Sequence, residues 1–279
     1  MRSMWTGTIR FSLVSIPVKI YSAIETSEKI QFNQLHRDDF GAIGYDKRCK
    51  KCNEVVTNDQ ITKGYQYEPD RYAIVEPDDL AKIKIKTTKA VDIVGFVARE
   101  EIPTTFYDAP YFAGPDGPVS ENPYALLREV MKQTGKIAVA KVVLRDREDL
   151  VALFPQDDGL VIQKLRYPHE LRKMEDVPDF ETVQRLDGEK LNKNELELAT
   201  TLVQQMATTL SQVDTEDNYF NALRTLVDSK IQGREVTELE EVDEVPRLDL
   251  MSALKKSLET SPLALVRSNT VTIANKKIA

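Results

Sequence analysis

The sequence contains few of the residues and motifs on which most enzymes and membrane proteins depend. It has no run of about 18 apolar residues, the length that a membrane-spanning helix needs. Only 2 cysteines and 2 histidines occur in 279 residues, so we expect no disulfide framework and a reducing cytoplasm. Phosphate-loop, dinucleotide-binding and G-x-S-x-G motifs are missing. These absences argue against a nucleotide-hydrolysing enzyme, a bound cofactor and a membrane location.

The formal net charge of −7 argues at first against nucleic-acid binding, because a basic surface is its usual signature. The charge is segregated, however. Residues 1–52 carry nine Lys and Arg against five acids, whereas residues 231–250 carry two cations against seven acids. A basic front and an acidic rear are compatible with one cation-lined surface on an otherwise acidic protein.

The first two thirds of the chain are dominated by strand patterns. Apolar residues from Trp5 to Leu13 alternate with polar ones, which is typical of a half-buried strand. Pro17 is expected to interrupt this region, and residues 29–36 to form another strand. The segment Thr134–Glu148 predicts a strand covered on both faces, with its cations toward the ends. Two further strands, on either side of the turn at residues 157–159, are expected to pair antiparallel, whereas residues 102–118 are rich in Pro and Gly and predict a loop.

Helical patterns appear in three places. Ser120 is the expected N-cap of a helix of about three turns that ends before Gly135. After Pro178, apolar residues recur at three- and four-residue spacing along two segments, the second of which ends at Gly233. Their apolar stripes predict docking on the β region or on another subunit. Residues 246–259 predict a short amphipathic helix, preceded by an acidic linker and followed by a loosely ordered tail.

Cys49 and Cys52 lie at the expected tip of a hairpin. A C-x-x-C turn can supply two thiolates to zinc, but a closed structural site needs four ligands. His36, or a second pair from a symmetric dimer, would have to complete it, so an incidental pair without metal is the main interpretation. The cluster of cations around the turn is the stronger signal, because it suits phosphate neutralisation. A merely solvated turn is the alternative for the cations at positions 47, 48, 50 and 51.

Taken in order, these segments resemble bacterial Ku, the DNA-end-binding family of nonhomologous end joining. The resemblance covers about residues 1–260. The matching stretches are MWTGTIRFSLVSIPVKIYSA, FNQLHRDD, YDKRCKKCNEVV, KGYQYEPDRYAIVEPDDL, YALLREVMKQTGKIAVAKVVLRDREDLVAL, ELATTLVQQMATTLSQVDTEDNYFNALRTLVDSKIQGRE and LDLMSALKKSL.

The resemblance implies an α+β, mainly β fold: a β-barrel core with a helical arm, forming a homodimeric ring that threads onto a double-stranded DNA end. Residues 1–233 would form this core, and residues 234–279 a linker, a short helix and a tail. Cations can then face the bore while acids cover the outside, so the net charge need not be positive. Binding would be independent of sequence and would weaken with salt.

The resemblance also implies candidate site residues. The first candidates for phosphate contact, on the segment that bridges over the DNA, are Arg37, Lys47, Arg48, Lys50 and Lys51. A second group, for which ion pairs within the barrel are the alternative, consists of Arg10, Lys141, Arg145, Arg147 and Arg166. The expected dimer contacts, for which packing within one chain is the alternative, are Tyr219, Phe220, Leu223 and Leu226.

The short helix near the C-terminus resembles the region that recruits a multi-domain, ATP-dependent DNA ligase of the ligase D type. The residues expected to contact the ligase are Leu248, Leu250, Met251 and Leu254. The acidic approach from Glu238 to Glu244 would repel DNA and suits a protein partner better. The long lysine-rich tail of many relatives is missing, since only Lys276 and Lys277 occur near the end of the sequence. A cytoplasmic, nucleoid-associated location follows from these expectations.

Overall fold

A computed structural model describes residues 1–25, 30–83, 89–144, 147–180 and 191–233 of the chain. The chain divides into two units. One comprises Met1–Lys29 and Asn33–Arg172, and the other Ile30–Phe32 and Lys173–Ala279. Arg145 and the predicted elements after residue 233 lie outside the described residues.

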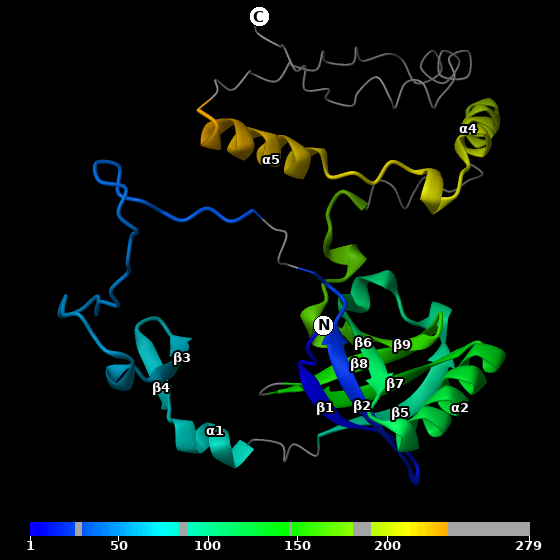
Figure 1. The fold of residues 1–279 in the computed structure, drawn as a ribbon, viewed down its shortest axis with the longest axis horizontal. Coiled ribbons are helices and arrows are strands. Elements are labelled where there is room, and N and C mark those ends of the chain that lie inside the picture. The colour runs from blue at the N-terminus through cyan, green and yellow to red at the C-terminus, as the bar shows by residue number, and fades with distance from the viewer. Residues whose placement is uncertain (26–29, 84–88, 145–146, 181–190, 234–279) are drawn as a thin grey trace, which may run out of the picture. The chain divides into compact units, whose positions relative to one another are not determined.

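Within the described part of the first unit, seven strands close into a barrel in the order β1-β2-β6-β9-β8-β7-β5 (Figure 1). β1 and β5 pair parallel and close the barrel, whereas the other neighbours pair antiparallel. The strands are β1 Trp5–Phe11, β2 Val14–Ser22, β5 Ala90–Ala98, β6 Tyr107–Pro115, β7 Lys136–Val143, β8 Glu148–Gln156 and β9 Gly159–Leu165.

The barrel interior is filled by branched aliphatic side chains that alternate along the strands. The predicted alternation in β1 is confirmed at Ile9, which is fully buried, while Leu13 lies outside the strand and is 99% exposed. A closed sheet has no unpaired edge, so its inward row forms a continuous core. The fully buried members of this row include Ile9, Ile16, Val18, Ile20, Val91, Val151, Leu153 and Ile162.

β7 is buried along one face and only at Ile137 on the other, so the predicted cover of both faces is confirmed in part. Ala138, Ala140 and Val142 belong to the main core, whereas Ile137 packs with Ala152 and Leu165 in a second cluster. Lys136 and Lys141 are exposed.

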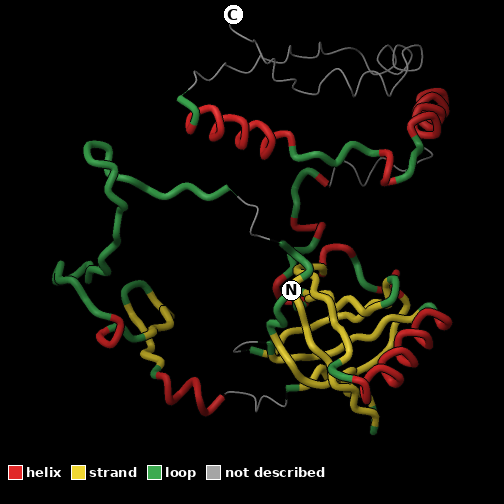
Figure 2. Tube along the Cα trace, in the orientation of Figure 1, coloured by secondary structure: helices red, strands yellow, loops and turns green. Residues whose placement is uncertain are grey.

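Helix α2, Pro118–Thr134, lies against the barrel (Figure 2) and contacts β2, β6, β7 and β8. It places Tyr124, Leu127 and Met131 in the main core. It has 17 residues and is therefore longer than predicted. Gly135 follows it with φ +64°, a conformation that favours glycine, as expected. The predicted N-cap is wrong: Gly117 precedes the helix, and buried Ser120 donates its hydroxyl to the Gly117 carbonyl oxygen at 2.7 Å.

Two predictions about prolines are wrong. β2 continues through Pro17. Its pairing with β6 begins only at Val18, so the N–H that proline lacks is not needed for a hydrogen bond between these two strands. The Pro17 carbonyl oxygen instead accepts the N–H of Asp116. The predicted loop contains β6, in which Pro110 follows a register irregularity and Pro115 is the last residue. Both are positions where a sheet tolerates proline.

Between β2 and β5 the first unit has little regular structure. The predicted strand near residue 35 is wrong among the described residues, where only an isolated bridge pairs Leu35 with Ala42. Further along, β3 Lys63–Glu68 and β4 Arg71–Val75 form a two-stranded hairpin, followed by helix α1, Pro77–Ile83. This strand and helix around Pro77 agree with the sequence pattern.

The second unit contains helices α4, Lys193–Met206, and α5, Asn218–Ile231. The Asn192 side chain caps α4 and the Asp217 side chain caps α5, each by accepting a backbone N–H. Neither helix has a buried residue. The predicted stripes therefore exist but are uncovered within the described chain. Short 3-10 helices are η1 Asn58–Gln60, η2 Arg99–Glu101, η3 Thr104–Phe106, η4 Pro168–Glu170, η5 Met174–Asp176 and η6 Leu210–Gln212.

Candidate nucleic-acid interface

A tight turn carries the densest group of cations in the described chain. The Cys49 N–H donates to the Glu54 carbonyl oxygen at 2.9 Å, and the Asn53 N–H donates to the Cys49 carbonyl oxygen at 2.8 Å. Arg48 and Val55 form an antiparallel bridge below it. Asn53 has φ +61°, a left-handed conformation that asparagine tolerates. The predicted hairpin tip at Cys49–Cys52 is confirmed.

The four cations of this turn, Lys47, Arg48, Lys50 and Lys51, will be called the basic turn. Lys47 donates from Nζ to Asn58 Oδ1, and Arg48 donates from Nη1 to the Asn53 carbonyl oxygen, both at 2.6 Å. Within the part of the chain that the structure describes, none of the four forms an ion pair with a carboxylate. Their positive charge is therefore not neutralised by a direct contact and is free to attract an anion.

The two thiols at the tip differ in their surroundings. The backbone N–H groups of Cys52 and Lys51, and then the Cys52 side chain, lower the pKa of the Cys49 thiol, with a weaker opposing effect from Glu54. Cys52 lies 3.8 Å from Glu54 Oε2, measured from its sulfur. Among the described residues, no group of three or more His, Cys, Asp and Glu side chains is arranged to hold a metal ion.

His36 and Arg37 lie on an exposed turn of their own. The His36 ring contacts Asp39 through Nδ1 at 2.8 Å, and Asp39 also accepts the Gly41 N–H at 2.8 Å. The Gly41 N–H and then His36 lower the pKa of Asp39. His36 is therefore engaged with a carboxylate, whereas exposed Arg37 has no ion pair among the residues described.

The barrel cations of the second candidate group lie beside acids. Arg10 forms two contacts with Asp92, Nε–Oδ1 at 2.6 Å and Nη2–Oδ2 at 2.8 Å, in a bidentate pair. Lys141 lies 3.0 Å from Glu148, whose hydrogen bond raises the pKa of the lysine. These contacts give each cation a structural partner. The other two pairs are Arg147 with Asp149 at 3.5 Å and Arg166 with Asp108 at 3.0 Å.

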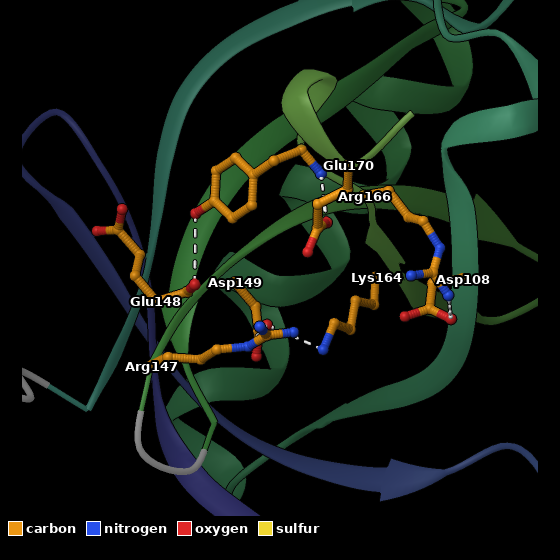
Figure 3. A network of polar contacts seen from close by, with 8 residues as sticks. Asp108, Arg147, Glu148, Asp149, Lys164, Arg166 and Glu170 are labelled. Atoms are coloured by element: carbon orange, nitrogen blue, oxygen red, sulfur yellow. Dashed lines mark hydrogen bonds and ion pairs between the residues drawn. The ribbon is translucent and has the colours of Figure 1, made fainter. Parts of the chain in front are cut away.

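Figure 3 shows how part of this group joins a network around β8 and β9. Asp149 is only 6% exposed and accepts from Lys164 at 2.9 Å as well as facing Arg147. Sequence patterning missed this pair. Lys164 continues the row of Leu160 and Ile162, which is the buried face of β9, so the period of two could have placed it toward the interior.

Nearby, Tyr167 connects the network to the backbone. Its hydroxyl donates to the Glu148 carbonyl oxygen at 3.3 Å, and its N–H donates to Glu170 at 2.9 Å, which lowers the pKa of Glu170.

The described part of the chain contains no helix with the length and apolar character of a membrane span.

Comparison with known proteins gives a consistent result. The family model described as "Ku70/Ku80 beta-barrel domain" matches residues 10–198. The chain is 39% identical to "Non-homologous end joining protein Ku" of Archaeoglobus fulgidus, over 93% of this chain and 99% of that protein. It is 35% identical to the proteins of the same name from Bacillus subtilis, covering 93% of this chain and 82% of that protein, and from Pseudomonas aeruginosa, covering 93% and 88%.

These similarities define a protein with a Ku-type β-barrel, and the closed barrel described above agrees with it. The chain belongs to the Ku family. The fold class predicted from the sequence is confirmed in its barrel core and accompanying helices.

Proposed function

We propose that this protein binds the ends of double-stranded DNA, independently of sequence, in nonhomologous end joining. The observation that carries the proposal is family membership along nearly the whole chain, since the relatives compared above are named for this process. The basic turn supports it physically. Its cations suit phosphate groups, which carry no sequence information directly.

In this proposal Lys50 and Lys51 contact phosphates most directly, because they are exposed and have no ion pair among the described residues. Lys47 and Arg48 hold the turn through their hydrogen bonds and add their charge. Arg37 adds a further exposed cation. A surface of this kind binds by releasing counterions from DNA, so its affinity falls steeply with salt.

The barrel cations rank second as DNA contacts. Arg10, Lys141, Arg147 and Arg166 are already beside carboxylates, and a phosphate would have to share or replace these partners. Arginine has five N–H donors and can keep a carboxylate while it binds a second anion. Arg145, outside the described residues, stays a candidate on the resemblance alone.

We further propose that two copies form the ring that encircles DNA. The support comes from α4 and α5, whose apolar stripes are not buried in the described chain. On α5, Tyr219 is 75% exposed, and Phe220, Leu223 and Leu226 are only partly covered. A helix with an uncovered apolar stripe gains free energy when a partner removes it from water. A second copy is the partner that family resemblance favours.

Recruitment of a multi-domain, ATP-dependent DNA ligase completes the proposal. The residues expected to carry it, Leu248, Leu250, Met251 and Leu254, lie outside the described residues. An acidic linker before them would keep this segment away from DNA phosphates. The protein itself would act without catalysis and without a cofactor, at the nucleoid in the cytoplasm.

A scaffold that recruits a ligase and contacts DNA only weakly is the competing function. Replacing Lys47, Arg48, Lys50 and Lys51 by glutamine distinguishes the two, with a matched control in which Lys173, Lys193, Arg224 and Lys230 are replaced. Each neutralised phosphate contact contributes about 0.9 to the slope of log affinity against log salt. The clamp predicts weaker binding and a lower salt slope for the first variant only. Equal binding by wild type and both variants would favour the scaffold.

A zinc-dependent or redox enzyme centred on Cys49 and Cys52 is an alternative from another class. Replacing both cysteines by serine tests it, together with measurement of the metal content of the purified protein. A DNA clamp retains binding to linear duplex after this change. The enzyme alternative instead predicts that this change abolishes an enzymatic activity.

A further inference from the structure

The two cysteines at the tip of the basic turn are the only ones in the sequence. Both are free thiols. Cys49 is half-buried and Cys52 is exposed, so small molecules can reach them. They lie three positions apart on the tight turn that the Asn53 N–H closes on the Cys49 carbonyl oxygen at 2.8 Å. Because the ends of a tight turn lie close together, a bond between the two sulfurs requires only a local adjustment of the turn.

The surroundings assign different roles to the two sulfurs. The backbone N–H groups of Cys52 and Lys51 lower the pKa of the Cys49 thiol, because they stabilise negative charge on its sulfur. Cations at positions 47, 48, 50 and 51 surround it in the sequence, and such surroundings favour the thiolate, the nucleophilic form of cysteine. Cys52 instead donates its thiol toward the Glu54 carboxylate at 3.8 Å. The Glu54 carboxylate therefore lies where it can accept the proton that Cys52 loses when it reacts.

We propose that Cys49 and Cys52 form a peroxide-reactive dithiol that closes to an intramolecular disulfide at the tip of the basic turn. The Cys49 thiolate attacks one oxygen of hydrogen peroxide, the O–O bond breaks, and Cys49 becomes a sulfenic acid while hydroxide leaves. The Cys52 sulfur then attacks the Cys49 sulfur and displaces its hydroxyl group. The Cys52 proton passes through Glu54 to this hydroxyl and forms water. Two thiols lose two electrons and one peroxide is reduced.

This chemistry goes beyond the proposed function and does not depend on it, because it is measured on the full chain without DNA. The probe is hydrogen peroxide, added to the reduced protein in a metal-free buffer. Wild type is expected to lose both free thiols, to lose the mass of two hydrogens, and to recover both thiols with a reducing agent. A non-reducing gel should show no crosslink between chains.

Single variants separate the two roles. Cys52→Ser is expected to stop at the sulfenic acid, which a dimedone probe traps on Cys49. Cys49→Ser is expected to lose its remaining thiol several-fold more slowly, because it removes the thiol whose pKa the backbone N–H groups of the turn lower. The urea-unfolded chain serves as a reference for thiols without the turn.

Three results would overturn the proposal. One is equal thiol loss in the two single variants, which would remove the assigned asymmetry. Another is a folded wild type that reacts no faster than the unfolded chain. The third is oxidised wild type that contains crosslinked chains, or two sulfinic acids, in place of an internal disulfide. Failure of any of these tests leaves the DNA-binding proposal unaffected, since neither cysteine is assigned to phosphate contact.

Discussion

The Lys164 ammonium group lies 2.9 Å from the Asp149 carboxylate, and both side chains are largely removed from water. Their side chains are 19% and 9% exposed. An ion pair this well covered is costly to form but much more costly to break, because the remaining charge then lacks a partner. Arg147 contacts the same carboxylate from the outside at 3.5 Å, so Asp149 compensates two cations (Figure 3).

Asp149→Ala is therefore expected to destabilise the protein strongly. The loss should be about 2–4 kcal/mol, somewhat below that of a fully buried pair because Lys164 keeps some exposure. Urea unfolding followed by circular dichroism measures it. Asp116→Ala is the matched control, since Asp116 pairs with Lys19 at 2.6 Å on a more exposed surface. A loss no larger than that of the control would contradict this account of the pair.

Tyr124 connects helix α2 to two barrel strands. Its hydroxyl donates to the Ala113 carbonyl oxygen at 2.5 Å and accepts the Leu160 N–H at 2.7 Å. Tyr124→Phe leaves both backbone groups without this partner in a buried place. We expect a loss of about 1–3 kcal/mol in the free energy of unfolding. Tyr45→Phe, at an exposed site, is the control and should change little; an equal effect of the two would refute the prediction.

The raised pKa of Tyr124 predicts that the protein loses stability at alkaline pH. Burial raises the pKa of Tyr124 above its ordinary value, because the phenolate would be poorly solvated. When the pKa of a tyrosine is higher in the folded than in the unfolded state, folding is stabilised in full at pH values below the unfolded-state pKa. This stabilisation is lost as the pH rises through the folded-state pKa.

Unfolding measured from about pH 8 to about pH 11 should therefore show a steeper loss for wild type than for Tyr124→Phe. Tyr167, whose pKa burial also raises, contributes equally in both proteins. Parallel curves for the two proteins would mean that Tyr124 ionises as it does in the unfolded chain.

Much of the barrel was predictable from local pattern. The burial of Ile9 follows from the period of two. The apolar residues on both faces of β7 indicated the burial of Ile137 opposite the main core row. β6 was not predictable, because Pro110, Gly114 and Pro115 are typical of loops. The sheet tolerates the two prolines because one follows a register irregularity and the other ends the strand. Both features arise only when β6 pairs with β9.

Likewise, only part of the candidate site could be predicted from local sequence pattern. The basic turn is local, so its cluster of cations and its two cysteines are visible in the sequence, whereas their contact with DNA phosphates stays a prediction. The Lys164–Asp149 pair depends on which face of β8 and β9 turns inward when the sheet closes. Closure involves strands distant in sequence, such as β1 and β5, and no single segment specifies it.

The uncovered stripe of α5 predicts self-association. Leu223→Glu should weaken the dimer by at least about 2 kcal/mol, because a charge would enter the centre of an apolar contact. Analytical ultracentrifugation over a concentration series measures the change. Thr225→Glu places the same charge at an exposed position on the same helix and should leave association nearly unchanged. A monomeric wild type, or equal effects of both variants, would contradict the proposed interface.

In the proposed function, the protein encircles DNA and needs a free end to load. The most direct measurement is a gel shift at moderate salt with a labelled linear duplex of roughly 40 base pairs, which offers far more phosphates than one basic turn can contact. Unlabelled linear duplex and covalently closed circle, at equal nucleotide concentration, serve as competitors. A ring that threads onto ends predicts that the linear competitor removes the shift and that the circle competes poorly. Equal competition by the circle would contradict threading and would leave a protein that binds phosphates through an open basic surface.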